Sequence, residues 1–518
     1  MAASDDTTLN SGRSPVQLAW WLIIGAAIFR LVYTFVYPVQ PAGDEAYYWD
    51  WGRRPDIGYY SKPPMIAWIY AVADRIGNGT VYGIRLLPIF FGTISAFLLH
   101  RLARDLFGAR IALIALLFAM AMPAFAILNL YLTIDAPLIL FWTGALLCFW
   151  RWTESRAAIW LVALCFCLGL GHLTKQMMMV FPVLAVIYLA TCPEKRHLLK
   201  SVGLWVCIIL SFVFLTPPLV WNSQNEWITF THTSHHFESN AGETQAPFWQ
   251  RYPINFGTFF GTQLGVLSPI TAIFLFIAIF VSFRKFRSLD PKIRYLVIFG
   301  GLPIAFMFCM SFRQVMQPNW AAVYYISAII LTAAWISKST LNPRWQKAAL
   351  ITGFSMIGLV YIIPPILKLA DRAGHKILDP TRRTLGYAEL GTRVDAIRTA
   401  KNIPADAIVV GLGHRDTASE LAFHLPVQPR VYRWEKLDVI ASQYEMWPNP
   451  EEDGLLGKDA IIIRPDVPRL LKRFMAGFES VEQVGEVKIR LSKEFERTFY
   501  IFHGKTLKKW PPREAVEK

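Results

Sequence analysis

Long runs of apolar residues dominate the first 370 positions of the chain. About eleven runs approach the roughly 20 residues that a helix needs to cross a bilayer, and an upper count of 13 spans is compatible with the sequence. Residues 16–369 are therefore predicted to form an all-α polytopic membrane domain. The predicted spans are 16–37, 81–100, 111–128, 131–150, 157–172, 176–191, 201–220, 256–283, 294–312, 319–337 and 347–368.

The pattern changes near residue 370, where the apolar runs shorten to the length of strands. Helical patterns separate these runs, and this alternation is typical of a small α/β domain. We predict a soluble α/β domain over 370–518. Its predicted strands are 407–411, 460–463 and 499–502, and its predicted helices include 387–400 and 416–425.

A glycine-containing turn lies inside this predicted domain. Gly411-Leu412-Gly413-His414-Arg415-Asp416 follows a predicted strand and precedes a predicted helix. A dinucleotide-binding turn would need a third glycine at a fixed spacing. We interpret the stretch as a plain strand-to-helix turn.

Composition agrees with a membrane protein. The 518 residues are 54% hydrophobic and 14% aromatic, with a net charge of +15 and a mean hydropathy of +0.35. No basic stripe interleaved with exposed aromatics accompanies this charge, so nucleic acid is not an expected partner. In membrane proteins, Lys and Arg instead gather in cytoplasmic loops.

The basic residues predict the orientation. They concentrate in alternate loops, such as the one containing Arg284, Lys285 and Arg287, and these loops fall on one side of the predicted spans. That side is cytoplasmic by the positive-inside rule, together with an N-terminal tail over 1–15. The loops 38–80 and 221–255 and the domain 370–518 are then exported.

The first exported loop combines acids, a lysine and aromatics at the edge of the membrane. Charges at this depth are functional candidates, and aromatic rings suit both the interface and a sugar face. The structural alternatives are an interface cap or salt bridge for the acids and a snorkelling lysine. The candidates are Asp44, Glu45, Lys62, Tyr47, Tyr48 and Tyr60.

Further candidates lie at other exported ends of spans. Asp135 opens the fourth span, with helix capping as its alternative. Arg313, Asn319 and Trp320 mark a later boundary, where Asn319 and Trp320 are predicted to line the substrate site and packing and interface anchoring are the alternative roles. No cofactor is required by these patterns. A divalent cation is possible, with His235 and His236 as weak candidate ligands, although their spacing matches no defined metal site.

Five short motifs occur along the chain in a specific order. They are Asp44-Glu45-Ala46, Lys62-Pro63-Pro64, TIDAPL at 133–138, GHLTK at 171–175 and QPNWAAVYY at 317–325. This order resembles the polyprenyl-phosphate-sugar glycosyltransferases of the GT-C fold, which include bacterial relatives of protein O-mannosyltransferases and the lipid A aminoarabinose transferase. The resemblance covers about residues 15–340.

The resemblance implies roles for individual residues. Asp44 matches the candidate catalytic base of the family, Lys62 the residue that contacts the lipid phosphate, and Asp135 a second acid. Glu45 is grouped with the catalytic acids, and Arg313 is the reserve ligand for the phosphate. One departure is Ser61, because the aminoarabinose transferase has Glu before its Lys-Pro-Pro.

The implied function is inverting transfer of a sugar from an undecaprenyl-type polyprenyl phosphate to an envelope acceptor: lipid A, a polysaccharide, a glycolipid or a protein. The enzyme would lie in the bacterial inner membrane, with its active site and C-terminal domain facing the periplasm. The alternatives are a transporter or lipid flippase, and a non-catalytic subunit of an envelope assembly. No internal repeat of the kind common in transporters is visible in the sequence.

Overall fold

The computed structural model describes residues 14–235 and 248–514, and the chain divides into two compact units. The first unit comprises Met1–Val36, Lys62–Ile66 and Arg85–Val360. The second comprises Tyr37–Ser61, Ala67–Ile84 and Tyr361–Lys518. Most of the loop 38–80, which is predicted to be exported, thus shares a compact unit with the C-terminal domain.

The first unit is helical throughout its described part. Its α-helices are α1 (Pro15–Val36), α4 (Val81–Phe107), α5 (Ala109–Met120), α6 (Pro123–Leu128), α7 (Asp135–Ser155), α8 (Ala158–His172), α9 (Val180–Thr191), α10 (Val202–Val213), α11 (Thr216–Gln224), α12 (Ile228–His235), α13 (Phe248–Leu267), α14 (Pro269–Arg284), α15 (Pro291–Leu296), α16 (Leu302–Arg313), α17 (Tyr325–Lys338) and α18 (Pro343–Leu369). The 3₁₀ turns η1 (Gln176–Met179), η2 (Arg196–Lys200), η3 (Phe286–Ser288) and η5 (Pro318–Tyr324) and the π-turn η4 (Val297–Gly301) connect or extend them.

Six helical stretches in the described part of the chain are long and apolar enough to cross a membrane. They are Pro15–Val36, Val81–Phe107, Val202–Gln224, Pro291–Arg313, Pro318–Lys338 and Pro343–Leu369. Shorter apolar helices cover Ala109–Met120, Ala158–His172 and Gln176–Thr191. The chain is therefore consistent with a multi-pass membrane protein, and the predicted number of eleven spans stays a prediction.

Two predicted spans are interrupted. The predicted span 256–283 is not one straight helix, because α13 and α14 meet at Ser268 and are bent by 111°, and whether the pair crosses the membrane stays a prediction. Ser268 has φ of 69°, outside the helical region, and Pro269 then starts the next helix. Likewise, the predicted span 111–128 ends as α5 at Met120 and resumes as α6 at Pro123.

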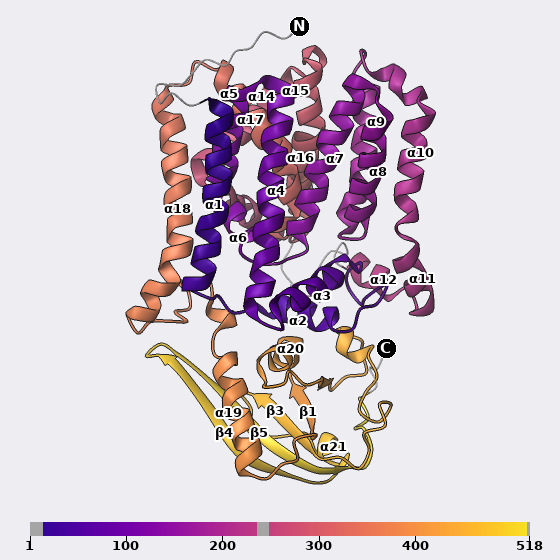
Figure 1. Ribbon diagram of the computed structural model, residues 1–518, viewed down its shortest axis with the longest axis vertical. Helices are drawn as coiled ribbons and strands as arrows, with labels where there is room; N and C mark the ends of the chain where they lie inside the picture. The colour runs from indigo at the N-terminus through magenta and orange to yellow at the C-terminus, as the bar shows by residue number, and fades with distance from the viewer. Residues whose placement is uncertain (1–13, 236–247, 515–518) are drawn as a thin grey trace. The chain divides into compact units, whose positions relative to one another are not determined.

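The core of the first unit is rich in aromatic rings. Trp142 and Phe149 on α7 pack against Phe181 on α9, and Phe149 also contacts Tyr295 and Phe299. In the same unit α7 packs along α8, and α8 along α10 (Figure 1). Such rings contribute a large packed area with defined edge-to-face geometry.

The second unit contains helices from the first loop and a sheet from the C-terminal domain. Its elements are α2 (Gly43–Gly52), most of α3 (Met65–Gly77), η6 (Arg382–Thr384), α19 (Tyr387–Ala400), β1 (Ile408–Leu412), α20 (Arg415–His424), β2 (Val431–Trp434), η7 (Gln443–Glu445), β3 (Ala460–Pro465), α21 (Lys472–Met475), β4 (Phe478–Ser492) and β5 (Phe495–Leu507). The five predicted elements of the C-terminal domain are confirmed within a few residues, as β1, β3, β5, α19 and α20.

The sheet is mixed, with strand order β2-β1-β3-β5-β4 (Figure 1). β1 runs parallel to β2 and β3, whereas β5 runs antiparallel to β3 and β4. In register, Val410 lies opposite Ile462, which lies opposite Phe502. These residues belong to one buried cluster, so the short apolar runs of the sequence correspond to strands that pack in a core.

The predicted strand-to-helix turn connects β1 to α20. Gly413 has φ of 94°, a conformation that a side chain disfavours. Gly411 has no room for a side chain, because a Cβ atom there would lie 2.9 Å from Cα of Ala418 on α20. α20 packs directly against α2 of the first loop.

Candidate functional site

A polar cluster in the first unit joins three of the motifs: Asp135 and Lys175 are buried, and Asn319 is exposed. Asp135 is the first residue of α7, Lys175 precedes η1, and Asn319 lies in η5. Nζ of Lys175 donates a hydrogen bond to Oδ1 of Asp135 across 2.8 Å, and Nδ2 of Asn319 donates to Oδ2 across 2.6 Å. The TIDAPL, GHLTK and QPNWAAVYY motifs therefore converge on one carboxylate.

Burial makes this cluster strongly constrained. Asp135 is only 2% exposed and Lys175 only 8% exposed. A buried carboxylate is tolerated when a cation and hydrogen bonds compensate for its lost hydration. Both oxygens of Asp135 are occupied by these partners, so the cluster has the properties of a rigid anchor.

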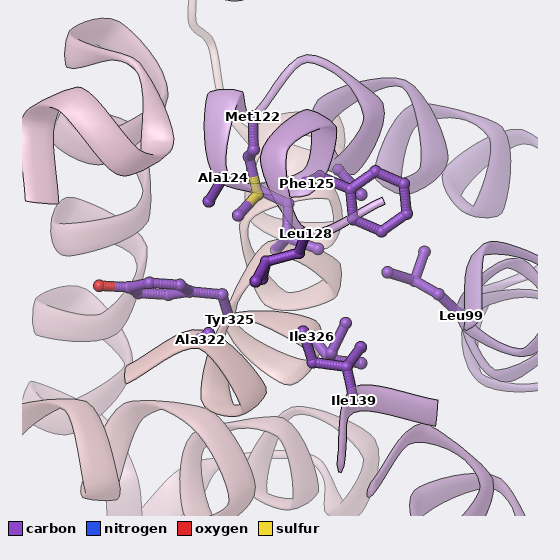
Figure 2. Close-up of a pocket in the computed structure, with 11 residues that line it drawn as sticks. Leu99, Met122, Ala124, Phe125, Leu128, Ile139, Ala322, Tyr325 and Ile326 are labelled. Atoms are coloured by element: carbon purple, nitrogen blue, oxygen red, sulfur yellow. The ribbon is translucent and has the colours of Figure 1, made fainter. Parts of the chain in front are cut away.

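The first unit also contains an apolar pocket (Figure 2). Ile139 follows Asp135 on α7, and Ala322 follows Asn319 on η5, so the elements that meet at the polar cluster also line the pocket. The side chains that line it are almost entirely apolar, and its empty space of about 360 Å³ includes a part that is open to solvent. The hydroxyl of Tyr325 points away from the other labelled side chains and donates a hydrogen bond to Gln263.

Three other predicted residues of the first unit lie at helix ends. Lys62 is half-buried just before Pro63-Pro64, while Arg313 is exposed at the C-terminal end of α16. Trp320 is half-buried against the apolar core. Their predicted roles, phosphate binding for the two cations and substrate lining for Trp320 and Asn319, stay predictions.

In the second unit, Asp44 on α2 pairs with Arg415, the first residue of α20. Nη2 of Arg415 lies 2.8 Å from Oδ1 of Asp44, and the Arg415 guanidinium stacks 4.7 Å from the ring centre of Tyr47. Burial alone would lower the pKa of Arg415, but the Asp44 carboxylate and the neighbouring tyrosines raise it overall. Arg415 is thus fixed as a cation beside the predicted base.

The remaining first-loop candidates are buried within the second unit. Oε2 of Glu45 accepts a hydrogen bond from the backbone N–H of Ala42, which is the helix cap foreseen as the structural alternative. The Tyr47 hydroxyl accepts from the backbone N–H of Gln443, and burial raises the pKa of Tyr47. Tyr48 packs against Trp51. The backbone N–H of Tyr60 donates to Oε1 of Gln443.

The weak metal candidates lie outside what is described. His236 belongs to the segment 236–247, and the side chain of His235 is likewise outside the described part. Among the residues that are described, no group of three or more His, Cys, Asp or Glu is arranged to hold a metal ion.

Two functional candidates were missed by sequence reasoning. Lys175 was quoted within the GHLTK motif but given no role, although a lysine beside a span boundary is itself a functional signal. Arg415 was assigned to a plain turn, because its partner Asp44 lies 371 positions away and no local pattern connects them.

The sequence is similar to those of known sugar transferases. Residues 61–221 match the family described as dolichyl-phosphate-mannose-protein mannosyltransferase. The chain is 26% identical to the lipid A galacturonosyltransferase of Rhizobium johnstonii over 435 residues, which are 82% of this chain and 86% of that protein. It is also 26% identical to the undecaprenyl phosphate-alpha-4-amino-4-deoxy-L-arabinose arabinosyl transferase of Photorhabdus laumondii, over 48% of this chain and 45% of that protein.

The fold matches a solved structure as well. The crystal structure of ArnT from Cupriavidus metallidurans bound to undecaprenyl phosphate aligns with a TM-score of 0.64 and 18% identity, covering 94% of this chain and 97% of that one. The two proteins thus share a fold. Together these findings confirm the predicted resemblance to the polyprenyl-phosphate-sugar glycosyltransferases of the GT-C fold.

Proposed function

We propose that this protein transfers a sugar from a polyprenyl phosphate to a lipid A-type acceptor on the periplasmic side of the bacterial inner membrane. The observation that carries the proposal is the Asp135–Lys175–Asn319 cluster, formed by motifs that resemble those of such enzymes, together with the apolar pocket. The similarity to named glycosyltransferases favours this activity over a transporter, a flippase or a non-catalytic subunit.

The donor is an amphipathic molecule, and the first unit offers surroundings of both kinds. The pocket of Figure 2 is lined by apolar side chains, the kind of surface that an isoprenoid chain contacts. Lys62 and the exposed Arg313 are the cations proposed to bind the phosphate. A lysine is a compact point charge that pairs well with a phosphate oxygen.

The reaction needs one bond to break and one to form. The bond between C1 of the sugar and the phosphate oxygen breaks, and the acceptor oxygen forms a bond to C1 from the opposite face, which inverts the anomeric centre. Asp44 accepts the proton of the acceptor hydroxyl. Its Oδ1 pairs with Arg415, and the side chain is 58% exposed, so an acceptor can reach the carboxylate. The released polyprenyl phosphate carries the electron pair, and Lys62 stabilises its charge.

We further propose that the transferred sugar is a hexuronic acid. The galacturonosyltransferase of Rhizobium johnstonii is similar over 86% of its own length, whereas arabinosyl transferases are similar over smaller shares of theirs, 45% in Photorhabdus laumondii and 62% in Yersinia pestis. Ser61 replaces the glutamate that precedes Lys-Pro-Pro in the aminoarabinose transferase. Removing a carboxylate at this position suits an anionic donor sugar better than an amino sugar.

Purified protein tests the proposal directly. Undecaprenyl phosphate linked to galacturonic acid, glucose or aminoarabinose would be supplied with lipid A, and the products would be identified by mass spectrometry. The expected result is galacturonic acid on lipid A and release of undecaprenyl phosphate. Lys62→Ala should raise the donor KM at least tenfold, and Lys62→Arg should restore part of it. Transfer of aminoarabinose alone would overturn the sugar assignment, and consumption of none of the three donors would overturn the proposed function.

A further inference from the structure

The C-terminal part of the second unit contains a second pocket, which has no role in the mechanism above. Its empty space of about 450 Å³ includes a part that is open to solvent. It is formed by β2, η7, the loop that follows η7 and the segment after β5. Aromatic side chains supply much of its wall: Trp434, Tyr444, Trp447 and Trp510.

The aromatic side chains of this pocket differ in their exposure. Trp434 and Tyr444 are buried, and each already donates a hydrogen bond, to the carbonyl of Pro511 and to Asp50 respectively. Trp447 and Trp510 are only half-buried. An aromatic ring with one open face attracts the slightly positive C–H groups on one side of a pyranose ring.

The polar lining offers both donors and acceptors. Oδ1 of Asn449 accepts from the backbone N–H groups of Glu451 and Glu452, while its amide nitrogen makes no hydrogen bond to any residue in the described part of the chain. Oε2 of Glu452 accepts from the backbone N–H of Asn449, which leaves Oε1 for another donor. An amide and a carboxylate side by side match the vicinal hydroxyls of a sugar.

Charge decides which sugars fit. Arg433 is held between Glu435 and Glu445, and its Nε donates to the carbonyl of Gly413. Arg513 pairs with Asp438 across 3.3 Å. The two lining arginines are therefore neutralised, and Glu452 adds a further negative charge. A phosphate or carboxylate would face repulsion here, whereas a neutral or amino sugar would not.

The pocket is tied to the helix that bears the predicted base. The Tyr444 hydroxyl donates to Oδ2 of Asp50 on α2 across 2.8 Å, and the guanidinium of Arg54 stacks 3.9 Å from the Trp447 ring centre. Asp44 lies at the start of the same helix. Pocket and base thus belong to one compact unit.

From these observations we infer that the pocket binds a neutral or amino-bearing sugar residue of the acceptor glycan. This inference rests on the proposed function for the identity of the glycan, but the binding itself requires no transfer. The pocket is then an acceptor subsite, distinct from the groups proposed to bind the anionic donor.

Saturation-transfer NMR on the full-length protein in detergent tests the inference, with chitobiose, a glucosamine disaccharide, as the probe and digalacturonic acid as its anionic counterpart. Chitobiose should receive saturation and digalacturonic acid much less. Trp510→Ala should weaken chitobiose binding at least tenfold, and Asn449→Ala about threefold to tenfold, since one hydrogen bond is lost. Trp345→Ala, an exposed tryptophan on α18, is the matched control with unchanged binding.

Three outcomes would overturn the inference. They are no saturation of chitobiose by the wild type, chitobiose binding by the Asn449→Ala and Trp510→Ala variants that equals wild-type binding, and a preference of the wild type for digalacturonic acid. Asn449→Ala keeps the test valid if Trp510→Ala fails to fold. Donor consumption measured on the same preparations separates the two claims. Normal chitobiose binding without consumption contradicts the proposed function alone, and normal consumption without chitobiose binding contradicts the subsite alone.

Discussion

Arg415 donates a hydrogen bond from Nη2 to Oδ1 of Asp44 across 2.8 Å, and its guanidinium also stacks on Tyr47. The two side chains are 27% and 58% exposed, so solvent screens the ion pair and its contribution to stability is small. Its main consequence is geometric. The hydrogen bond from Arg415 fixes Oδ1 of Asp44, and this also sets the direction in which Oδ2 points.

The first prediction concerns Asp44 itself. Asp44→Asn should reduce sugar transfer by about 10²–10⁴-fold, because an amide cannot accept the proton of the acceptor hydroxyl. The amide oxygen can still accept the hydrogen bond from Arg415, so the thermal unfolding midpoint should stay unchanged. The rate of lipid-linked sugar consumption by purified protein measures the loss. Turnover at the wild-type rate would remove Asp44 from the mechanism.

The second prediction assigns a positioning role to Arg415. Arg415→Ala should lower kcat about tenfold, the cost of one charge-assisted hydrogen bond, and leave the donor KM unchanged. Arg415→Lys should recover part of the loss, because the charge returns but the planar stacking on Tyr47 does not.

A surface ion pair in the same unit supplies the control. Arg393 pairs with Glu389 on α19, and both side chains are exposed. Arg393→Ala should leave kcat unchanged. If Arg415→Ala also leaves kcat unchanged while Asp44→Asn abolishes transfer, orientation by Arg415 is not required.

The secondary structure of the C-terminal domain was predictable, because its strands are short apolar runs that pack in one core. Ala460 to Ile463 illustrates this, since all four residues are buried in β3. The bend at Ser268 was not predictable from hydropathy. Apolar residues continue on both sides of it, and periodicity does not reveal a positive φ in one residue.

Candidate residues were predictable one at a time, whereas their partners were not. Asp135 was recognised as an acid at the end of a span, but its link to Lys175 depends on how α7 and η1 meet in three dimensions. The link from Asp44 to Arg415 likewise depends on packing between α2 and α20. An ion pair between segments that are far apart in the chain produces no characteristic spacing of residues in the sequence.

The third prediction uses the buried pair of Asp135 and Lys175. Lys175→Met should destabilise the protein by about 3–5 kcal/mol, because it leaves a buried carboxylate without its cation. Combining it with Asp135→Asn should recover much of that stability, since the remaining amide is neutral. Thermal unfolding of the single and double variants in detergent gives the coupling energy.

Additive effects of the two substitutions would contradict this pairing. Activity is a separate readout, and it should stay low in the double variant even where stability returns. A double variant that is both stable and fully active would show that the cluster is dispensable for transfer.

The fourth prediction is a dependence of stability on pH. His424 on α20 is buried, with its side chain 6% exposed and Nε2 3.3 Å from Oε2 of Glu420. Burial lowers the pKa of His424 to about 4, below its ordinary value of 6.5. Between pH 4 and pH 6.5, the His424 side chain is therefore protonated in the unfolded chain and neutral in the folded chain. Stability should fall as pH drops from about 6.5 to 4, by up to about 3 kcal/mol.

Hydrogen–deuterium exchange of β1 and α20 at several pH values measures this effect. His424→Gln should flatten the curve between pH 6.5 and 4. Glu420 has the opposite effect. Its burial, and secondly the charge of Asp416, raise the pKa of its carboxyl group. As pH rises above about 4.5, the carboxyl ionises more readily in the unfolded chain than in the folded chain, so the stability of the fold falls. Glu420→Gln should therefore slow exchange at pH 7 and have little effect at pH 4. A pH-independent difference between wild type and His424→Gln would contradict the assignment.

The last prediction concerns topology, and the bend between α13 and α14 makes it decisive. If these helices form one broken span, the basic loop with Arg284, Lys285 and Arg287 lies in the cytosol, as the positive-inside rule requires. If they form a re-entrant loop, the same residues return to the exported side. A cysteine replacing the exposed Ser288 should react with a membrane-impermeant maleimide only after lysis of spheroplasts. A cysteine replacing the exposed Ser480 of β4 should react in intact spheroplasts. The background must lack all six native cysteines, because Cys309 is exposed. Labelling at position 288 in intact spheroplasts would establish the re-entrant arrangement and reverse the predicted sidedness of the loop.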